Sequence, residues 1–165
     1  MKKQSNTLAD KLSLIFLSFF GSGYAPKAPG TAGSLATIPF LYLYAYLKLP
    51  LIFLILIIAL LTYVACIVTE KIQKKRRVHD PGWIVIDEVI GMLITWCFVF
   101  PSTNYIDIIL VFITFRIFDI FKIWPATYFD KRVKHGSGTI LDDVISAFYA
   151  GIAILIIKNF IPFFN

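Results

Sequence analysis

The sequence predicts an all-α, multihelical integral membrane protein with about five membrane helices. Of its 165 residues, 58% are hydrophobic and only 16% are charged, whereas about one quarter of a soluble domain is charged. Apolar segments recur between short polar breaks, and sixteen phenylalanines exceed what a small soluble core needs. No repeat, low-complexity tract or linker divides the chain, so residues 1–165 are expected to form a single membrane domain.

The N-terminal segment, residues 1–20, is predicted to form an amphipathic helix that lies in the membrane interface. A cleaved signal peptide is the alternative, because a basic start precedes a short apolar run. Asp10 and Lys11 lie too close to that run, and no small-x-small cleavage site follows it. The apolar stripe of this helix, at helical spacing, comprises Leu8, Leu12, Ile15 and Phe19.

Five apolar segments follow and account for the predicted membrane helices. A spanning helix needs about 20 mostly apolar residues. Only the second segment meets that length easily, and the others reach it by including the polar residues at their ends. The segments are residues 35–47, 51–68, 89–100, 106–121 and 144–157.

The basic residues predict how these helices are oriented. They gather at 71–77 and 122–134, after the second and fourth segments, whereas 101–105 contains none. Because basic loops remain on the cytoplasmic side, the polar stretches 21–34, 76–88 and 116–143 all fall on that face. The net charge of +6 thus indicates contact with an anionic membrane surface rather than with nucleic acid. A site assembled from three cytoplasmic loops is the natural inference.

Carboxylates concentrate in these polar stretches. Residues 87–88 and 142–143 are adjacent acidic pairs, each expected to begin a helix. A lone acid there would cap free N–H groups and complement the helix dipole. Two pairs of like charges require counter-charge, and Mg²⁺ prefers oxygen ligands. The sequence therefore predicts a Mg²⁺ site. Its candidate catalytic and metal-binding residues are Asp80, Asp87, Glu88, Asp119, Asp142 and Asp143.

Basic and glycine-rich motifs could bind a phosphate beside that metal. Arg116, Asp119 and Lys122 recur three apart and share one helix face, where Arg offers a planar fork and Lys a point charge. The alternative is an internal Arg–Asp pair. The loop KHGSGT and the stretch 21–34 are either ordinary turns or walls of an anion site; His135 is either a general acid–base or a surface residue. The candidate phosphate-binding residues are Lys27, Thr31, Ser34, Arg116, Lys122, His135 and Gly136.

Five motifs carry a family resemblance. They occur in order between Gly21 and Gly151 and together resemble those of bacterial phosphatidylglycerophosphatase A. Ile86, Ile123 and Ser137 stand where that family often has Trp, Pro and Gly. The motifs are GSGYAPKAPGTAGSLATIPF, VHDPGWIVIDEVIGM, FRIFDIFKIWP, YFDKRV and GSGTILDDVISAFYAG.

The resemblance implies a Mg²⁺-dependent lipid phosphatase of the bacterial cytoplasmic (inner) membrane, with an all-helical fold. The implied reaction converts phosphatidylglycerophosphate to phosphatidylglycerol and phosphate in phospholipid biosynthesis. It also places an acidic family position on Asp130 and basic ones on Arg116 and Lys122. The nucleophile is either an activated water or a carboxylate, and the acyl chains are expected to stay in the bilayer.

Two alternatives remain. One is a membrane enzyme that acts on another lipid phosphate or pyrophosphate. The other is a non-enzymatic transporter or scaffold, whose acids would form an ion path and would spread across the membrane depth. Here the motif acids gather on one predicted face, with Asp107 as the exception near the outer end.

Overall fold

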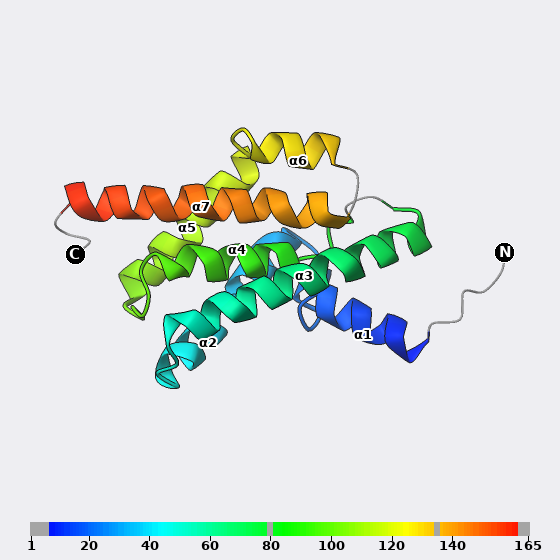
Figure 1. The fold of residues 1–165 in the computed structure, drawn as a ribbon, viewed down its shortest axis with the longest axis horizontal. Coiled ribbons are helices and arrows are strands. Elements are labelled where there is room, and N and C mark those ends of the chain that lie inside the picture. Colours follow the sequence, from blue (N-terminus) through cyan, green and yellow to red (C-terminus); the bar gives the residue numbers. More distant parts are fainter. Residues whose placement is uncertain (1–6, 79–80, 134–135, 162–165) are drawn as a thin grey trace.

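The computed structural model describes residues 7–78, 81–133 and 136–161. Within these residues every regular element is a helix and there is no strand, which confirms the predicted all-α fold (Figure 1). The elements are α1 (Leu8–Leu17), η1 (Ser22–Tyr24), α2 (Pro29–Tyr46), α3 (Leu51–Arg76), α4 (Ile86–Cys97), α5 (Tyr105–Phe121), α6 (Ala126–Arg132) and α7 (Gly136–Phe160).

Each predicted apolar segment lies largely within a helix of its own, namely α2, α3, α4, α5 or α7. Two of them, α3 with 26 residues and α7 with 25, are long and apolar enough to cross a membrane by length and composition. The other three are shorter, and α4 has only 12 residues. The number of membrane helices therefore remains a prediction.

Helix α4 forms the centre of the core, where α2, α3, α5 and α7 all pack against it. Ten of its twelve residues are buried. Glycines allow close packing: a Cβ added to Gly91 would lie 2.2 Å from the Phe115 ring of α5, and one added to Gly151 of α7 would lie 2.1 Å from Phe98. Small residues of this kind let helices approach closely where the medium offers little hydrophobic drive.

The starts of α2 and α7 differ from the sequence-based expectation. Asp142 and Asp143 were predicted to begin a helix, but α7 begins at Gly136, so the two acids lie six and seven residues after its first residue. The Gly-Ser-Gly-Thr run can be helical here because Gly136 and Gly138 pack against backbone: added Cβ atoms would lie 2.3 Å from the Glu70 nitrogen and 1.9 Å from the Val133 oxygen. Likewise, α2 begins at Pro29 within the predicted loop, with proline at a position suited to the first helical turn.

Helix α1 lies against the last turns of α3. Leu8, Leu12 and Ile15 are exposed along one side, as the predicted stripe requires, but the helix ends before Phe19. Asp10 accepts from Lys75 Nζ at 2.5 Å and closes a capping box with Thr7. These hydrogen bonds, the one from Lys75 above all, lower the pKa of Asp10 to about 2. The α1 helix is thus fixed to α3 through a carboxylate that stays ionised.

Candidate active site

Three carboxylates, which we call the carboxylate cluster, meet between α4 and α7. They belong to Asp87, Glu88 and Asp143, and one ligand oxygen from each lies within 4.8 Å of the others. Asp87 and Asp143 are buried, with 7% and 3% exposure, and the Glu88 side chain is 15% exposed. Crowded like charges that are also desolvated require a positive ligand or a shared proton.

The start of α4 is held in place from three sides. The Val85 nitrogen donates to the Leu17 oxygen at 2.9 Å, which joins this turn to the end of α1. Trp83 stacks on Tyr24, with ring centroids 6.0 Å apart, and lies under the Arg76 guanidinium. Asp87 Oδ1 accepts from the Glu88 nitrogen at 3.1 Å. The first-turn role that a lone acid would play is therefore present for Asp87, alongside its place in the cluster.

Helix α5 brings Arg116 to the cluster. Arg116 Nη1 lies 2.5 Å from Asp119 Oδ2 and 3.9 Å from Glu88 Oε1. The internal Arg–Asp pair that the sequence left as an alternative is thus present, and the same guanidinium also faces the cluster. The Arg116 guanidinium, which the Asp119 carboxylate holds in place and which faces the Glu88 carboxylate, is suited to bind an oxyanion.

Lys122 is the second cation at the site. It ends α5 at φ 40°, an uncommon conformation for a residue other than glycine. Its ammonium pairs with Asp142 and lies 3.8 Å from Asp143 Oδ1. Burial of Lys122 favours the neutral amine, but the carboxylates of Asp143 and Asp142 outweigh it and raise the pKa of Lys122 above its ordinary value. Lys122 therefore carries a positive charge beside the cluster.

One buried atom tests whether a metal would fit the cluster. Oε2 of Glu88 is buried and has no hydrogen-bond partner among the residues that the structure describes. Buried polar atoms nearly always have a partner, so such an atom calls for a ligand. Carboxylate oxygens are the donors that hard divalent cations take. The donor set of the cluster thus fits a cation such as Mg²⁺.

The first turn of α2 closes the site from another side. A Cβ added to Gly30 would lie 2.0 Å from Glu88 Oε1 and 3.2 Å from Arg116 Nη1. Only glycine lets the α2 backbone come so close to the Glu88 carboxylate, and the N-terminal end of a helix favours that negative charge. The sequence reasoning missed Gly30. The Pro-Gly step would have pointed to it, since Pro29 marks the first turn of a helix.

The remaining predicted residues are placed less directly. Lys27 is exposed before α2, Thr31 is half-buried in the first turn of α2, and the Ser34 hydroxyl donates to the Gly30 oxygen at 3.0 Å within that helix. Gly136 faces the α3 backbone. Asp80 and His135 lie outside the described residues, as does the side chain of Asp130. The structure therefore joins three of the six predicted metal ligands into the cluster, and pairs Asp119 and Asp142 with the adjacent cations.

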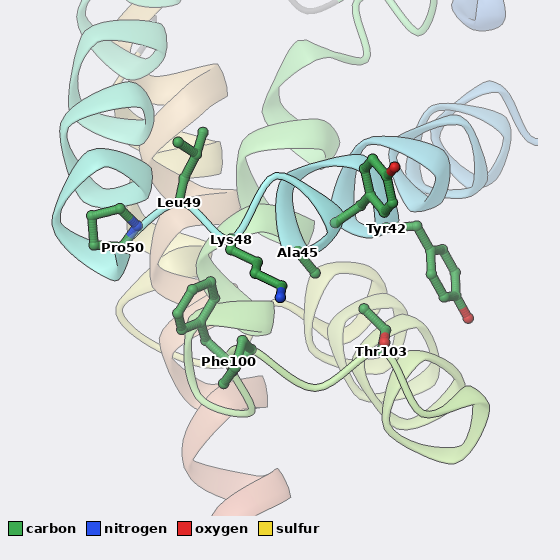
Figure 2. Close-up of a pocket in the computed structure, with 9 residues that line it drawn as sticks. Tyr42, Ala45, Lys48, Leu49, Pro50, Phe100 and Thr103 are labelled. Carbon is green, nitrogen blue, oxygen red and sulfur yellow. The ribbon is translucent and has the colours of Figure 1, made fainter.

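A second, mainly apolar region lies at the opposite ends of α2 and α4. A cavity of about 700 Å³ opens there, with Tyr42 and Tyr46 of α2 and Phe100 after α4 in its wall. Figure 2 shows the Lys48 side chain directed into the space between Ala45, Phe100 and Thr103. The described residues that line this cavity include no acid, so their chemistry differs from that of the cluster.

Comparison with known proteins identifies the family. Residues 15–158 match the family model of phosphatidylglycerophosphatase A. Phosphatidylglycerophosphatase A of Escherichia coli (strain K12) is 39% identical over 127 residues, which cover 77% of this chain and 72% of the relative. The Haemophilus influenzae (strain ATCC 51907 / DSM 11121 / KW20 / Rd) protein of the same name is 41% identical over 140 residues, 84% of each chain.

A more distant relative carries another name. A Bacteroides thetaiotaomicron protein, provisionally named a phosphatidylinositol-3-phosphatase, is 32% identical over 145 residues, which cover 84% of this chain and 89% of the relative. No solved structure matches the chain. An all-helical chain with this site and these relatives is a phosphoric monoester hydrolase. It belongs to the phosphatidylglycerophosphatase A family.

Proposed function

We propose that the chain hydrolyses phosphatidylglycerophosphate to phosphatidylglycerol and phosphate, as a step of phospholipid biosynthesis. The observation that carries the proposal is the carboxylate cluster, whose oxygens lie within 4.8 Å of one another beside two cations. The reaction is the one named for the Escherichia coli and Haemophilus influenzae relatives.

The cluster is assigned to Mg²⁺, with Asp87, Glu88 and Asp143 as the residues that hold it. Bound Mg²⁺ would supply Lewis acidity for the phosphomonoester and lower the pKa of a water molecule. Glu88 Oε2 is the oxygen that most directly supports this assignment, since no described residue hydrogen-bonds to it. Asp80, Asp119 and Asp142 remain proposed acids of the active site. Asp119 and Asp142 contribute by pairing with Arg116 and Lys122.

Arg116 and Lys122 neutralise the phosphate oxygens. Asp119 holds the Arg116 fork, and Asp142 and Asp143 keep Lys122 protonated. Lys27, Thr31, Ser34, His135 and Gly136 complete the proposed phosphate contacts. The attacking group is a water that loses its proton to a carboxylate, or a carboxylate that forms an acyl phosphate, which water then hydrolyses; in both routes the lipid oxygen leaves phosphorus and takes up a proton. Borohydride trapping of an acyl phosphate distinguishes these two routes.

The bundle is placed across the bacterial cytoplasmic membrane, with the cluster on the cytoplasmic side. The apolar length of α3 and α7 supports this placement, and so do the basic residues at the end of α3. Helices α2, α4 and α5 complete five spans. A labelling experiment tests the orientation: in a background without Cys66 and Cys97, Lys48→Cys should react with an impermeant maleimide in spheroplasts and Lys27→Cys should not. The reverse pattern contradicts the orientation.

The direct test of the function is phosphate release by the purified protein in detergent micelles. Phosphatidylglycerophosphate should be hydrolysed with Mg²⁺, and chelation should abolish the reaction. Activity that survives chelation contradicts the metal assignment. A protein that releases no phosphate from this lipid with Mg²⁺ contradicts the function.

A second candidate is hydrolysis of another lipid phosphomonoester, which the name of the Bacteroides relative favours. A panel that includes phosphatidic acid and phosphatidylinositol 3-phosphate separates the two. The primary proposal requires the highest kcat/KM for phosphatidylglycerophosphate.

A further inference from the structure

An apolar groove of about 640 Å³ runs along the outside of the bundle between α3, α4 and α7. We call it the acyl groove. Its walls include Ala59 and Ile55 of α3, Ile94 and Phe98 of α4, and Val144 of α7. None of the described residues that line it is charged. Among them, only Thr62 and Tyr63 carry hydroxyl groups, and the Thr62 hydroxyl donates to the Ile58 oxygen at 2.8 Å within α3. The groove therefore suits a hydrocarbon chain.

The acyl groove approaches the carboxylate cluster along α4 and α7. Val144 directly follows Asp143 on α7, and Ile94 lies six residues after Glu88 on α4, about 9 Å along the helix. From Tyr63 to Ile55 of α3 the groove continues for roughly 12 Å. A molecule whose phosphate lies at the cluster would thus have this groove directly beside it.

The groove is open along its side. Tyr63, Phe148 and Ile55 on its margin are 67%, 51% and 47% exposed. The Phe98 and Phe148 rings meet edge to face at a centroid distance of 6.2 Å and form one wall. A chain could therefore enter from the surrounding lipid without any opening of the bundle.

We propose that the acyl groove holds one acyl chain of the phospholipid while its phosphate lies at the carboxylate cluster. The proposal rests on the proposed function and extends it, since at least one chain then contacts the protein instead of remaining in bulk lipid. Moving a chain from lipid into an apolar groove removes little surface from water, so the gain in affinity is small. The groove acts by orienting the lipid so that its phosphate meets the cluster.

A second apolar groove provides a built-in comparison. It lies on the other side of α3, between α2, α3 and α4, has a volume of about 400 Å³, and includes Ile57 and Val89 in its lining. Val89 follows Glu88, so this groove also starts near the cluster. It is smaller and is flanked by the packed rings of Phe19 and Phe40, 5.1 Å apart. Among the described residues that line it, none comes from α7, the helix that carries Asp143. These differences favour the acyl groove.

Three tryptophan substitutions on α3 test the proposal at sites of similar exposure. Ile55→Trp fills the far end of the acyl groove, Ile57→Trp fills the second groove, and Leu60→Trp changes a residue that lines neither. Ile55, Ile57 and Leu60 are 47%, 41% and 62% exposed, so none of the changes disturbs the core. Ala59→Phe, within the acyl groove, serves as an independent second variant.

The measurement is kcat/KM for phosphatidylglycerophosphate with dipalmitoyl or dihexanoyl chains. Ile55→Trp and Ala59→Phe should lower the value for the dipalmitoyl substrate about tenfold, because the lipid is misoriented. Both variants should keep the wild-type kcat/KM for the dihexanoyl substrate. Unchanged activity on this substrate also shows that the active site is still folded. Ile57→Trp and Leu60→Trp should match the wild type with both substrates.

Three results would overturn the proposal. The first is a chain-length-selective loss in Ile57→Trp but not in Ile55→Trp, which would assign the chain to the second groove. The second is equal behaviour of the Ile55, Ala59 and Leu60 variants with both substrates. The third is a wild-type protein that hydrolyses neither substrate. This result overturns the proposed function itself, and it is distinct from the first two because it is seen in the wild type before any variant is compared.

Discussion

The two ends of the bundle bury acids in opposite ways. At one end Asp107 of α5, with 4% exposure, meets Lys158 of α7 at 2.8 Å in a one-to-one pair. At the other end three carboxylates lie within 4.8 Å of one another, and their cations, Arg116 and Lys122, are shared with further acids. A balanced pair is a structural arrangement. Crowding of like charges, rather than burial alone, is what distinguishes the candidate active site.

The largest expected effect comes from removing one charge of the cluster. Asp143→Asn should lower phosphate release by more than about 100-fold, because the loss of a partner that only supports a metal ligand already costs about 10–100-fold. Asp107→Asn is the matched control, since it neutralises a buried aspartate at the other end and should leave the turnover per folded molecule near that of the wild type. Equal losses in the two variants would remove the distinction between the ends.

The next effect concerns the close approach of α2 to the cluster. Gly30→Ala places a Cβ about 2.0 Å from Glu88 Oε1, so the carboxylate or the helix must shift. Because misplacement of about 1 Å can cost about 100-fold, a loss of about 10- to 100-fold in kcat/KM is expected. Gly82→Ala is the control, since its Cβ would meet nothing closer than Pro29 Cγ at 4.0 Å. Full activity in Gly30→Ala would show that the α2 start does not shape the site.

The balanced pair should matter for stability instead. Asp107→Asn leaves Lys158 without its partner in a partly buried site, which should lower the free energy of unfolding by about 1–3 kcal/mol after allowance for the exposure of the lysine. Thermal unfolding in detergent measures this change. The double variant Asp107→Asn/Lys158→Met should recover part of the loss. An unchanged midpoint in Asp107→Asn would mean that the pair contributes nothing.

The last prediction is that the pH dependence of kcat/KM contains no contribution from Lys122 up to about pH 10. A base whose pKa is raised in the folded state keeps its charge until the pH reaches that raised pKa. The stability that depends on the charge is complete below the ordinary pKa of 10.5 and is lost as the pH rises from there to the raised pKa. Lys122 should thus cause no alkaline decline in kcat/KM between about pH 7 and 10. Profiles of the wild type and Lys122→Arg should have the same shape. A decline present in the wild type and absent from Lys122→Arg would show that Lys122 loses its proton in this range.

The fold could be predicted largely from the apolar segments, because α2, α3, α4, α5 and α7 each contain most of one predicted segment. The starts of α2 and α7 could not be predicted in this way. Gly136 and Gly138 resemble a flexible loop in sequence, and only their contact with the backbone of α3 and with Val133 explains why they are helical. Local preference for a turn was outweighed there by tertiary packing.

The candidate site was predicted in its residue types but not in its pairing. Asp87, Glu88 and Asp143 could be selected because adjacent acids at the edge of apolar segments are unusual. Asp119 pairs with Arg116 three residues away on α5, as the sequence allowed, whereas the pairing of Asp142 with Lys122 depends on the packing of α5 on α7. Of the six acids selected from the sequence, three form the cluster, two are paired beside it, and Asp80 lies outside the described residues.

Metal binding by the purified protein tests the central claim most directly. Mn²⁺, used as a paramagnetic substitute for Mg²⁺, can be titrated by electron paramagnetic resonance into the wild type, Asp143→Asn and Asp107→Asn without any turnover. We predict that the wild type and Asp107→Asn bind Mn²⁺ alike and that Asp143→Asn binds at least about tenfold more weakly. Equal binding by the wild type and Asp143→Asn would contradict the assignment of the carboxylate cluster as the metal site.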